Sequence, residues 1–276
     1  MSLFNANEVL RRLGLTDKVM ISAGKIDGIT FINKFGHSDN VGTATDPQDV
    51  WSGAPETFAA DGGTYTFSTT AAIDTISSSN AGDDQLFTII GLDGDWNEVT
   101  QTATLNGQAK VVLGTSLIRV YRAYNSGTTD LAGNFYIYED TPIVAGVPTL
   151  KTKIRAKVVN GTNQTEMAIY TIPKGKTGFF LKGYVGLSKN TTTEGEFVHK
   201  ARPFGGVFLT KGRIGLSSIG ASYWIYEYAI PPSMPEKTDI KITCVKVGAN
   251  NTGAVGAFDL LLIDNTLLAK IETVQY

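Results

Sequence analysis

Residues 86–107 read LFTIIGLDGDWNEVTQTATLNG and contain two extended segments separated by a run of turn residues. Phe87 and Ile89 lie two positions apart, as residues on one face of a β-strand do. The run at 91–95 supplies the glycine and aspartate residues that favour a turn, and an extended pattern resumes at Val99. This stretch predicts a strand, a turn and a second strand, and we expect the rest of the chain to be arranged around it.

The stretch ends in Asn106-Gly107, a pair that tolerates positive φ and often forms hairpin turns. We therefore expect the next run, residues 109–113, to fold back antiparallel onto the segment that precedes the turn.

Further short extended segments follow throughout the chain, and most are separated by Gly, Pro or Asn residues. They span residues 29–32, 64–67, 72–77, 116–124, 133–139, 153–159, 167–172, 178–187, 195–201, 205–209, 222–230, 239–247 and 257–263. Many short strands without intervening helices are typical of β-sandwiches. We predict an all-β fold, a jelly-roll-like β-sandwich with two β lobes and a short N-terminal helix or arm.

The segment 141–149 is the best candidate for a linker because it contains two prolines and a glycine. It divides the chain into a β-sandwich module over residues 27–149 and a second β-sandwich module over residues 150–276. Both modules fall within the usual size range of a domain. Residues 1–26 are then an N-terminal helical arm.

Helical spacing is clearest in this arm, where three apolar residues share one face: Val9, Leu10 and Leu13. Asn5 or Asn7 is a suitable N-cap, and Gly14 is a suitable end. So short a helix needs a surface to pack on. Two alternatives stay open: a strap across the protein's own sheet, and an assembly arm that docks on a neighbouring subunit.

Composition favours a structural β-protein. Charged residues make up 18% of the 276 residues, below the roughly 25% typical of soluble domains, and the formal net charge is −2. Binding to nucleic acid needs clustered Lys and Arg, so we expect no nucleic-acid partner. The first residues lack the basic and apolar segments of a secretory signal, and no apolar run approaches the roughly 20 residues that span a bilayer. We expect synthesis in a cytoplasm and no membrane partner.

Two side chains are predicted to fill the interior. Cys244 is the only cysteine and lies among apolar residues, which predicts a small buried side chain without a reactive role. Trp51 lies in a loop-rich region, where we expect it to fill a hydrophobic gap under the loops.

Residues 174–177 (KGKT) are similar to the end of a phosphate-binding loop, but Tyr170 stands where that loop requires glycine. The following residues are also strand-like, whereas a phosphate-binding loop precedes a helix. We predict a turn at 174–177 and no cofactor.

Asp93, Asp95 and Asn97 have the alternate spacing that begins a calcium loop, but the glycine of that loop is absent. We predict a solvated turn and no metal. A weak calcium site assembled with Asp83 or Asp84 stays open as an alternative.

His37 and His199 are the only histidines, so a histidine-based zinc site or a Ser-His-Asp triad would have to use one of them. The sequence contains no Gly-x-Ser-x-Gly motif. We predict that the protein is not an enzyme. A glycosidase with paired carboxylates remains the enzymatic alternative, and the sequence singles out no such pair.

An aromatic cluster at residues 223–228 (YWIYEY) is the candidate glycan contact, through Tyr223, Trp224 and Tyr226, because aromatic rings stack on sugars. Residues of one strand alternate between its two faces, so about half of the cluster is expected to belong to the core.

Short motifs succeed one another between residue 27 and about residue 140. They are KFG at 34–36, DVW at 49–51, ISSS at 76–79, IGLD at 90–93, NE at 97–98, LNG at 105–107 and IRV at 118–120. Together with IPKGKT at 172–177, they resemble a module common in virion structural proteins of tailed bacteriophages. One departure is Gln101, which stands where an acidic residue is more usual.

This resemblance implies a capsid-associated or tail-associated component and brings no catalytic residues with it. The first hypothesis is a capsid decoration or cement protein that is located in the virion, made in the host cytoplasm and homo-oligomeric. Its partners would be the major capsid protein or other virion proteins. The alternatives are a tail, neck or fibre component that binds a host-surface receptor or glycan, and a glycan hydrolase of the virion.

Overall fold

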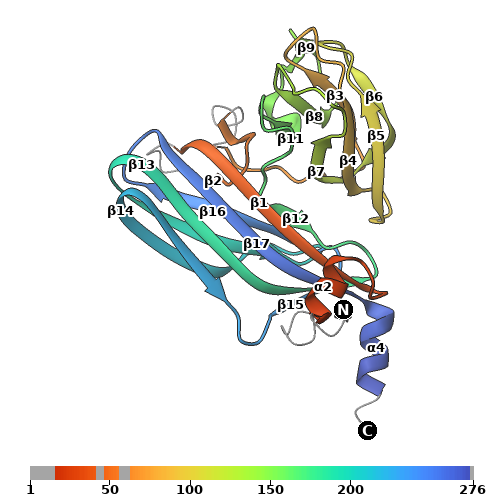
Figure 1. The fold of residues 1–276 in the computed structure, drawn as a ribbon, viewed down its shortest axis with the longest axis vertical. Helices are drawn as coiled ribbons and strands as arrows, with labels where there is room; N and C mark the ends of the chain where they lie inside the picture. Colours follow the sequence, from red (N-terminus) through yellow and green to blue (C-terminus); the bar gives the residue numbers. More distant parts are fainter. Residues whose placement is uncertain (1–15, 42–46, 56–62, 274–276) are drawn as a thin grey trace, which may run out of the picture.

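The computed structural model describes residues 16–41, 47–55 and 63–273, and this part of the chain is mostly β-structure (Figure 1). The strands are β1 (Ile29–Val41), β2 (Gln48–Asp49), β3 (Ile73–Ser78), β4 (Leu86–Leu92), β5 (Glu98–Thr104), β6 (Val111–Leu117), β7 (Arg119–Asn125), β8 (Phe135–Glu139), β9 (Ile143–Val144), β10 (Val147–Pro148), β11 (Ile154–Val158), β12 (Ile169–Thr171), β13 (Lys176–Arg202), β14 (Leu209–Glu227), β15 (Ser233–Met234), β16 (Asp239–Val247) and β17 (Thr252–Asp264). Helical elements in the described part include α2 (Thr16–Ser22), η1 (Lys151–Lys153) and α4 (Asn265–Thr273). The predicted all-β, sandwich-like fold is confirmed.

The largest sheet has the strand order β1-β17-β13-β16-β12, and β14 pairs with the other side of β13. The first half of β13 pairs with β17 and its second half with β16, while β14 follows it through both halves. The bent β13–β14 hairpin therefore contributes to both layers of a sandwich. Phe180, Phe197 and Phe258 are buried in the interior of this sandwich.

A second, smaller sandwich consists of a four-stranded sheet, β11-β8-β3-β6, and a three-stranded sheet, β5-β4-β7. The two sheets face each other across a common core. Phe87 of β4 stacks on Phe135 of β8 with ring centroids 4.1 Å apart. The smaller sandwich lies at one end of the larger one (Figure 1).

The strand pairing differs from the predicted division at residue 149. β1 and β2 come early in the chain, yet they pair with β17 and β16 of the large sheet. β11, which follows residue 149, pairs instead with β8 of the smaller sandwich. The smaller sandwich is thus an insertion between β2 and β12, because the strands that enclose it in sequence share one sheet.

The predicted linker at 141–149 is a tight hairpin of β9 and β10. Ala145 and Gly146 have φ values of 48° and 75° at its turn. The Ser77 hydroxyl donates a 2.7 Å hydrogen bond to the Gly146 carbonyl, which packs this turn on β3. Glycine and proline mark a turn here and not a flexible connection.

The hairpin of residues 86–104 is confirmed, with a register that runs from the pair Leu86 and Thr104 to the pair Leu92 and Glu98. At its turn, a carboxylate oxygen of Asp93 accepts hydrogen bonds from the backbone N–H groups of Asp95 and Asn97, each at 2.9 Å. The alternate residues 93, 95 and 97 are therefore linked by hydrogen bonds that hold the turn.

The prediction that residues 109–113 pair with the preceding strand is wrong. The chain does turn at Gly107, where φ is 53° and the Ala109 N–H bonds to the Asn106 carbonyl. β6 then crosses to the opposite sheet and pairs with β3. This path buries Leu113 and Leu117 in the core between the sheets. Pairing with β5 would not bury them, because the residues of β5 are themselves partly or fully exposed.

Two other predicted strands are not formed as expected. Residues 64–67 are not a strand, and the Tyr65 N–H donates instead to the Asp49 carboxylate at 2.6 Å. Of residues 205–209 only Leu209 belongs to a strand, because the chain turns at Gly205 with a φ of 72°. Trp51 is buried under the loops and contacts the edge of the Tyr65 ring, which confirms its predicted role.

The predicted helix with Val9, Leu10 and Leu13 lies outside the described residues. The described helix α2 begins after Gly14, the predicted helix end. Helix α4 was not predicted, although Asn265 is a good N-cap residue and strong helix formers follow it.

A buried ion pair connects the two sandwiches. Arg119 of β7 donates from Nε to Oδ1 of Asp239 at 2.8 Å and from Nη2 to Oδ2 at 3.1 Å. The Asp239 carboxylate also accepts hydrogen bonds from Arg202 and from the Thr171 hydroxyl. The carboxylate oxygens are thereby shared between groups of both sandwiches.

Replacement of Arg119 should destabilise the protein strongly, since it leaves the Asp239 carboxylate buried without its main partner. We expect Arg119→Met to lower the free energy of unfolding by about 3–5 kcal/mol in urea titrations. The control is Lys110→Met, which breaks the more exposed Lys110–Asp140 pair and should cost at most about 1 kcal/mol. Equal effects of the two variants would contradict the structural role of Arg119.

The turn at Gly146 should not accept a side chain. A Cβ atom there would lie 1.7 Å from the Ser78 carbonyl oxygen, whereas Gly161, with a similar φ of 78°, has no atom within 4 Å of such a Cβ. Both Gly→Ala variants carry backbone strain, but Gly146→Ala adds a steric clash. We expect it to cost about 1–3 kcal/mol more than Gly161→Ala in denaturant unfolding. Equal costs would show that the turn is not packed on β3.

Candidate functional site

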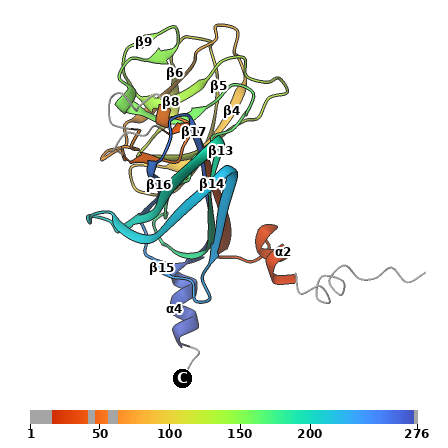
Figure 2. The same cartoon turned by 90° about the vertical axis from the view of Figure 1, so that its left-hand side faces the viewer.

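The β13–β14 hairpin forms the open side of the large sheet. In the described part of the chain β14 pairs only with β13, so the other backbone edge of this 19-residue strand is unpaired by a strand. The opposite edge of the sheet differs, because Arg122 of the smaller sandwich donates a hydrogen bond to the Asn33 carbonyl of β1. An open edge offers N–H and C=O groups to another chain. Figure 2 shows β13 and β14 side by side below the smaller sandwich.

The register of the large sheet brings apolar side chains together on its outer side. One row across four strands consists of Phe35, Ala257, Tyr184 and Ile225, and the next of His37, Val255, Gly186 and Tyr223. We call Phe31, Phe35, Tyr184, Tyr223 and Ile225 the outer face. Tyr223 is 74% exposed and Ile225 is 57% exposed. Apolar side chains gathered on one exposed surface mark interaction sites.

A polar row crosses the outer face between Phe31 and Phe35. Asn33 donates to the Asp259 carboxylate at 2.6 Å, and Lys182 lies 3.4 Å from the same carboxylate. Beyond it, α2 lies over one end of the face and leaves a hollow of about 560 Å³, into which Ile21 and Phe31 project apolar groups.

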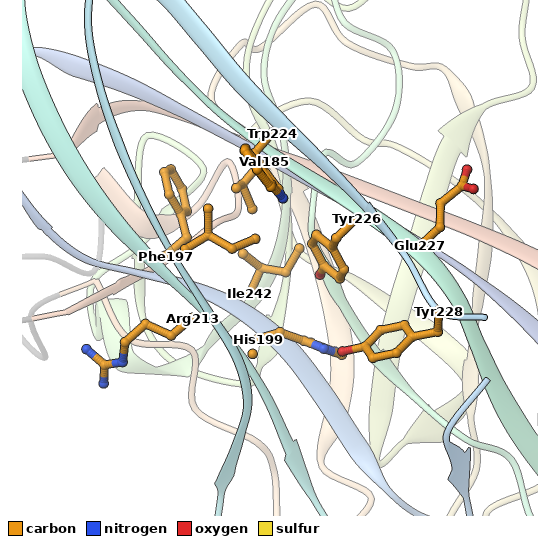
Figure 3. A pocket seen from close by; sticks show the side chains of 11 residues that line it. Val185, Phe197, His199, Arg213, Trp224, Tyr226, Glu227, Tyr228 and Ile242 are labelled. Carbon is orange, nitrogen blue, oxygen red and sulfur yellow. The ribbon is translucent and has the colours of Figure 1, made fainter. Parts of the chain in front are cut away.

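The three predicted glycan contacts do not lie on one surface. Tyr223 lies on the outer face, whereas Trp224 and Tyr226 point into a cavity between the two layers of the hairpin (Figure 3). The residues of this strand do alternate between its two faces, but of the cluster only Tyr226 and Tyr228 pack against the core. Trp224 remains 54% exposed at the cavity mouth.

This cavity, which we call the hairpin cavity, has a volume of about 210 Å³. Its apolar walls are Val185, Phe197, Ile214 and Ile242. Arg213 and Glu227 also border it, with their charged ends directed away from its centre (Figure 3). The bend of the hairpin creates the cavity, because β14 contributes residues from both of its halves.

His199 is the polar group in the cavity wall that sequence reasoning missed. It pairs with Gly212 on one side and Ile242 on the other, and its ring lies 4.2 Å from that of Phe180. The side chain is buried, and neither ring nitrogen has a hydrogen-bond partner. Burial, with a smaller contribution from Lys211, lowers the pKa of His199 to about 3. The imidazole is therefore neutral at pH 7 and offers one donor and one acceptor.

Tyr226 adds a second neutral polar group. Its hydroxyl also has no hydrogen-bond partner in the structure. Burial, with a contribution from Tyr228, raises the pKa of Tyr226. Both pKa values are far from 7, which suits hydrogen bonding in recognition and does not suit proton transfer near neutral pH.

A second titratable cluster lies between the sandwiches. Lys34 is fully buried and donates to the Tyr121 carbonyl, and burial together with Arg122 lowers its pKa well below the usual value. The Tyr121 hydroxyl donates to Glu98 at 2.6 Å. The alternation Ile32, Lys34, Gly36 in the sequence could have placed this lysine on an inward face.

The buried carboxylates bear on the glycosidase alternative, and Asp259 with its partners Asn33 and Lys182 has been described above. Asp49 accepts from Lys241 and from the Thr243 hydroxyl at 2.6 Å each, and Asp83 accepts from two backbone N–H groups at 3.0 Å. Asp239 is held by the arginines described above. Each carboxylate is occupied by donors from the protein's own fold, which assigns them structural roles.

Cys244 is buried, as predicted, and burial raises the pKa of its thiol to about 12. Among residues 16–41, 47–55 and 63–273, no three His, Cys, Asp or Glu side chains group in a way that would hold a metal ion. No helix in these ranges is both long and apolar enough to cross a bilayer.

The sequence matches none of the known family models, and no curated protein matches it. Among solved structures, a chain of the infectious bursal disease virus Gt strain is 13% identical over 86% of this chain and 72% of its own, with a TM-score of 0.20. The VP2 subviral particle of the same virus gives 10% identity over 90% and 78%, with a TM-score of 0.21. A putative secreted protein of Parabacteroides distasonis gives 9% identity over 87% and 90%, with a TM-score of 0.17. Likenesses at this level carry no argument about this chain.

The buried imidazole makes the stability depend on pH. Folding favours neutral His199, so its contribution is fully present above the usual pKa of 6.5 and is lost as the pH falls towards 3. Between pH 7 and pH 5 the wild type should lose about 2 kcal/mol relative to His199→Phe. Urea unfolding of both proteins at the two pH values measures this difference. If the difference in unfolding free energy between the two proteins is the same at pH 7 and pH 5, His199 is not buried as a neutral group.

Proposed function

We propose that this chain is a structural protein of a virion and that it assembles through the outer face and the open edge of β14. The specific role we propose is that of a capsid decoration or cement protein of a tailed bacteriophage, without enzymatic activity. It would be made in the host cytoplasm and would bind the major capsid protein or other virion proteins as a homo-oligomer. The phage assignment rests only on the resemblance of the short motifs between residue 27 and about residue 140.

The observation that carries the proposal is the outer face itself. Its large apolar side chains lie on a sheet whose neighbouring strand edge is unpaired in the described part of the chain. A surface of this kind is stabilised when another chain covers it. The polar row of Asp259 and Lys182 that crosses it would restrict the partner's orientation.

The predicted arm is part of this proposal, although it lies outside the described residues. Val9, Leu10 and Leu13 precede α2, which already lies over one end of the outer face. An arm that begins there can extend either along its own sheet or onto a neighbouring subunit. We favour the neighbouring subunit, because many moderate contacts of this kind stabilise symmetric shells.

A tail, neck or fibre component that binds a host glycan is the second candidate. It is favoured by Trp224, whose half-exposed indole ring can stack on a sugar at the protein surface. Under this alternative Trp224→Ala abolishes binding to cells and leaves assembly unchanged, whereas under the decoration role it changes neither.

Copy number per particle tests the decoration role. Quantitative mass spectrometry of virions should give a ratio to the major capsid protein near one to one or one to three. A few copies to a few dozen would instead support a tail, neck or fibre location. Absence from the particle would refute the virion proposal.

Polar substitutions on the outer face should weaken assembly without unfolding the protein. We expect Tyr184→Ser combined with Ile225→Ser to lower the affinity for particles that lack the protein by about tenfold or more. Val112→Ser is the matched control, because Val112 is 73% exposed but lies on the smaller sandwich. Sedimentation of protein with particles measures the affinity. Equal binding by the double variant and the control would exclude the outer face.

A further inference from the structure

We propose that the hairpin cavity is a binding site for a small uncharged ring that carries one hydrogen-bonding group, as phenol and indole do. Val185, Phe197 and Ile242 supply the apolar walls, and His199 and Tyr226 supply the hydrogen bonds. This inference does not depend on the proposed assembly role, because the cavity lies on the opposite side of the sheet from Tyr223 and Ile225.

The unpaired polar atoms are the first argument. Both nitrogens of His199 and the hydroxyl of Tyr226 are buried and lack partners, although buried polar groups in folded proteins are nearly always hydrogen-bonded. All three belong to side chains that line one cavity. A ligand with a polar hydrogen would satisfy at least one of them, and the imidazole can act as donor or acceptor.

The size of the cavity is the second argument. A volume of about 210 Å³ exceeds the roughly 150 Å³ that is known to hold a benzene ring in a protein interior. The walls are mainly aliphatic and aromatic, which favours a flat apolar body with a small polar portion. A sugar ring, which carries polar groups on all sides, would leave most of its hydroxyl groups unpaired against these walls.

The electrostatics of the cavity argue for an uncharged ligand. Burial keeps the imidazole of His199 and the phenol of Tyr226 neutral at pH 7. Of the charged side chains that border the cavity, Arg213 is paired with Glu196, and Glu227 points away from the centre. A charged ligand would lose its hydration without gaining a partner of opposite charge.

The entrance follows from a missing side chain. Gly212 lies directly across the ladder from His199, and a Cβ atom there would meet nothing closer than the Tyr228 hydroxyl at 3.9 Å. Trp224, which also lines the cavity, is 54% exposed. The ligand ring can be free in solution, or it can be the side chain of a tyrosine or tryptophan of another chain.

The test compares phenol with toluene, which has the same size but no polar hydrogen. Titration of the full chain with each compound, followed by the NMR shifts of the His199 ring, yields two dissociation constants. We expect phenol to bind at about 1 mM or tighter. His199→Phe and Tyr226→Phe should each shift the phenol-to-toluene preference by about three- to tenfold towards toluene.

Two controls complete the experiment. Gly212→Leu should fill the cavity and abolish binding of both compounds while leaving His199 in place, and Tyr223→Ala on the outer face should change nothing. N-acetyltyrosinamide distinguishes the two sources: binding as tight as phenol indicates a partner side chain, and exclusion indicates a free ring compound. The proposal is overturned if phenol shows no binding at a concentration ten times the expected dissociation constant. It is also overturned if the phenol-to-toluene preference is the same in the wild type and in both substituted proteins.

Discussion

The buried ion pair between Arg119 and Asp239 is the interaction on which the arrangement of the two sandwiches depends. Arg119 belongs to the inserted sandwich and Asp239 to the large sheet, where Arg202 shares the same carboxylate. The desolvation of buried charges costs free energy that their attraction barely offsets. A docking that buried these groups without pairing them would cost several kcal/mol. We infer that the pair selects one relative orientation more than it adds stability.

This orientation decides which side of the large sheet is left open. The inserted sandwich covers Lys34 with Tyr121 and contacts the β1 edge through Arg122. The β13–β14 hairpin contacts that sandwich through its loop, where the Phe204 and Trp96 ring centroids lie 5.4 Å apart, and the other edge of β14 is unpaired by a strand in the described residues. Its two faces differ, because the outer one is broad and apolar while the inner one encloses His199. One hairpin therefore offers a surface suited to another protein and a cavity suited to a small ring.

Local patterns predicted the elements whose stability is itself local. The hairpin around Asp93 was predicted because its turn is held by hydrogen bonds between near neighbours in the chain. The burial of Trp51 and Cys244 was predicted from their apolar side chains and from the neighbouring residues in the sequence. The segment at 141–149 was misread as a linker, because proline and glycine mark a turn whether or not it packs on the domain. The predicted pairing of residues 109–113 with the preceding strand was wrong. Pairing with β3 buries Leu113 and Leu117 between the two sheets, and this burial stabilises the fold more than pairing with the adjacent strand would.

The sequence by itself determined the all-β character, most of the turns and the alternation that divides Tyr223 from Trp224, because these depend on chemistry within a few residues. Only the tertiary structure decided that β1 closes on β17 and that Arg119 meets Asp239, 120 residues away. It also decided that His199 is enclosed, since the bend of β13 brings distant parts of β14 around it. Strand partners are chosen by the burial of a shared core, and no local pattern records which segments share it.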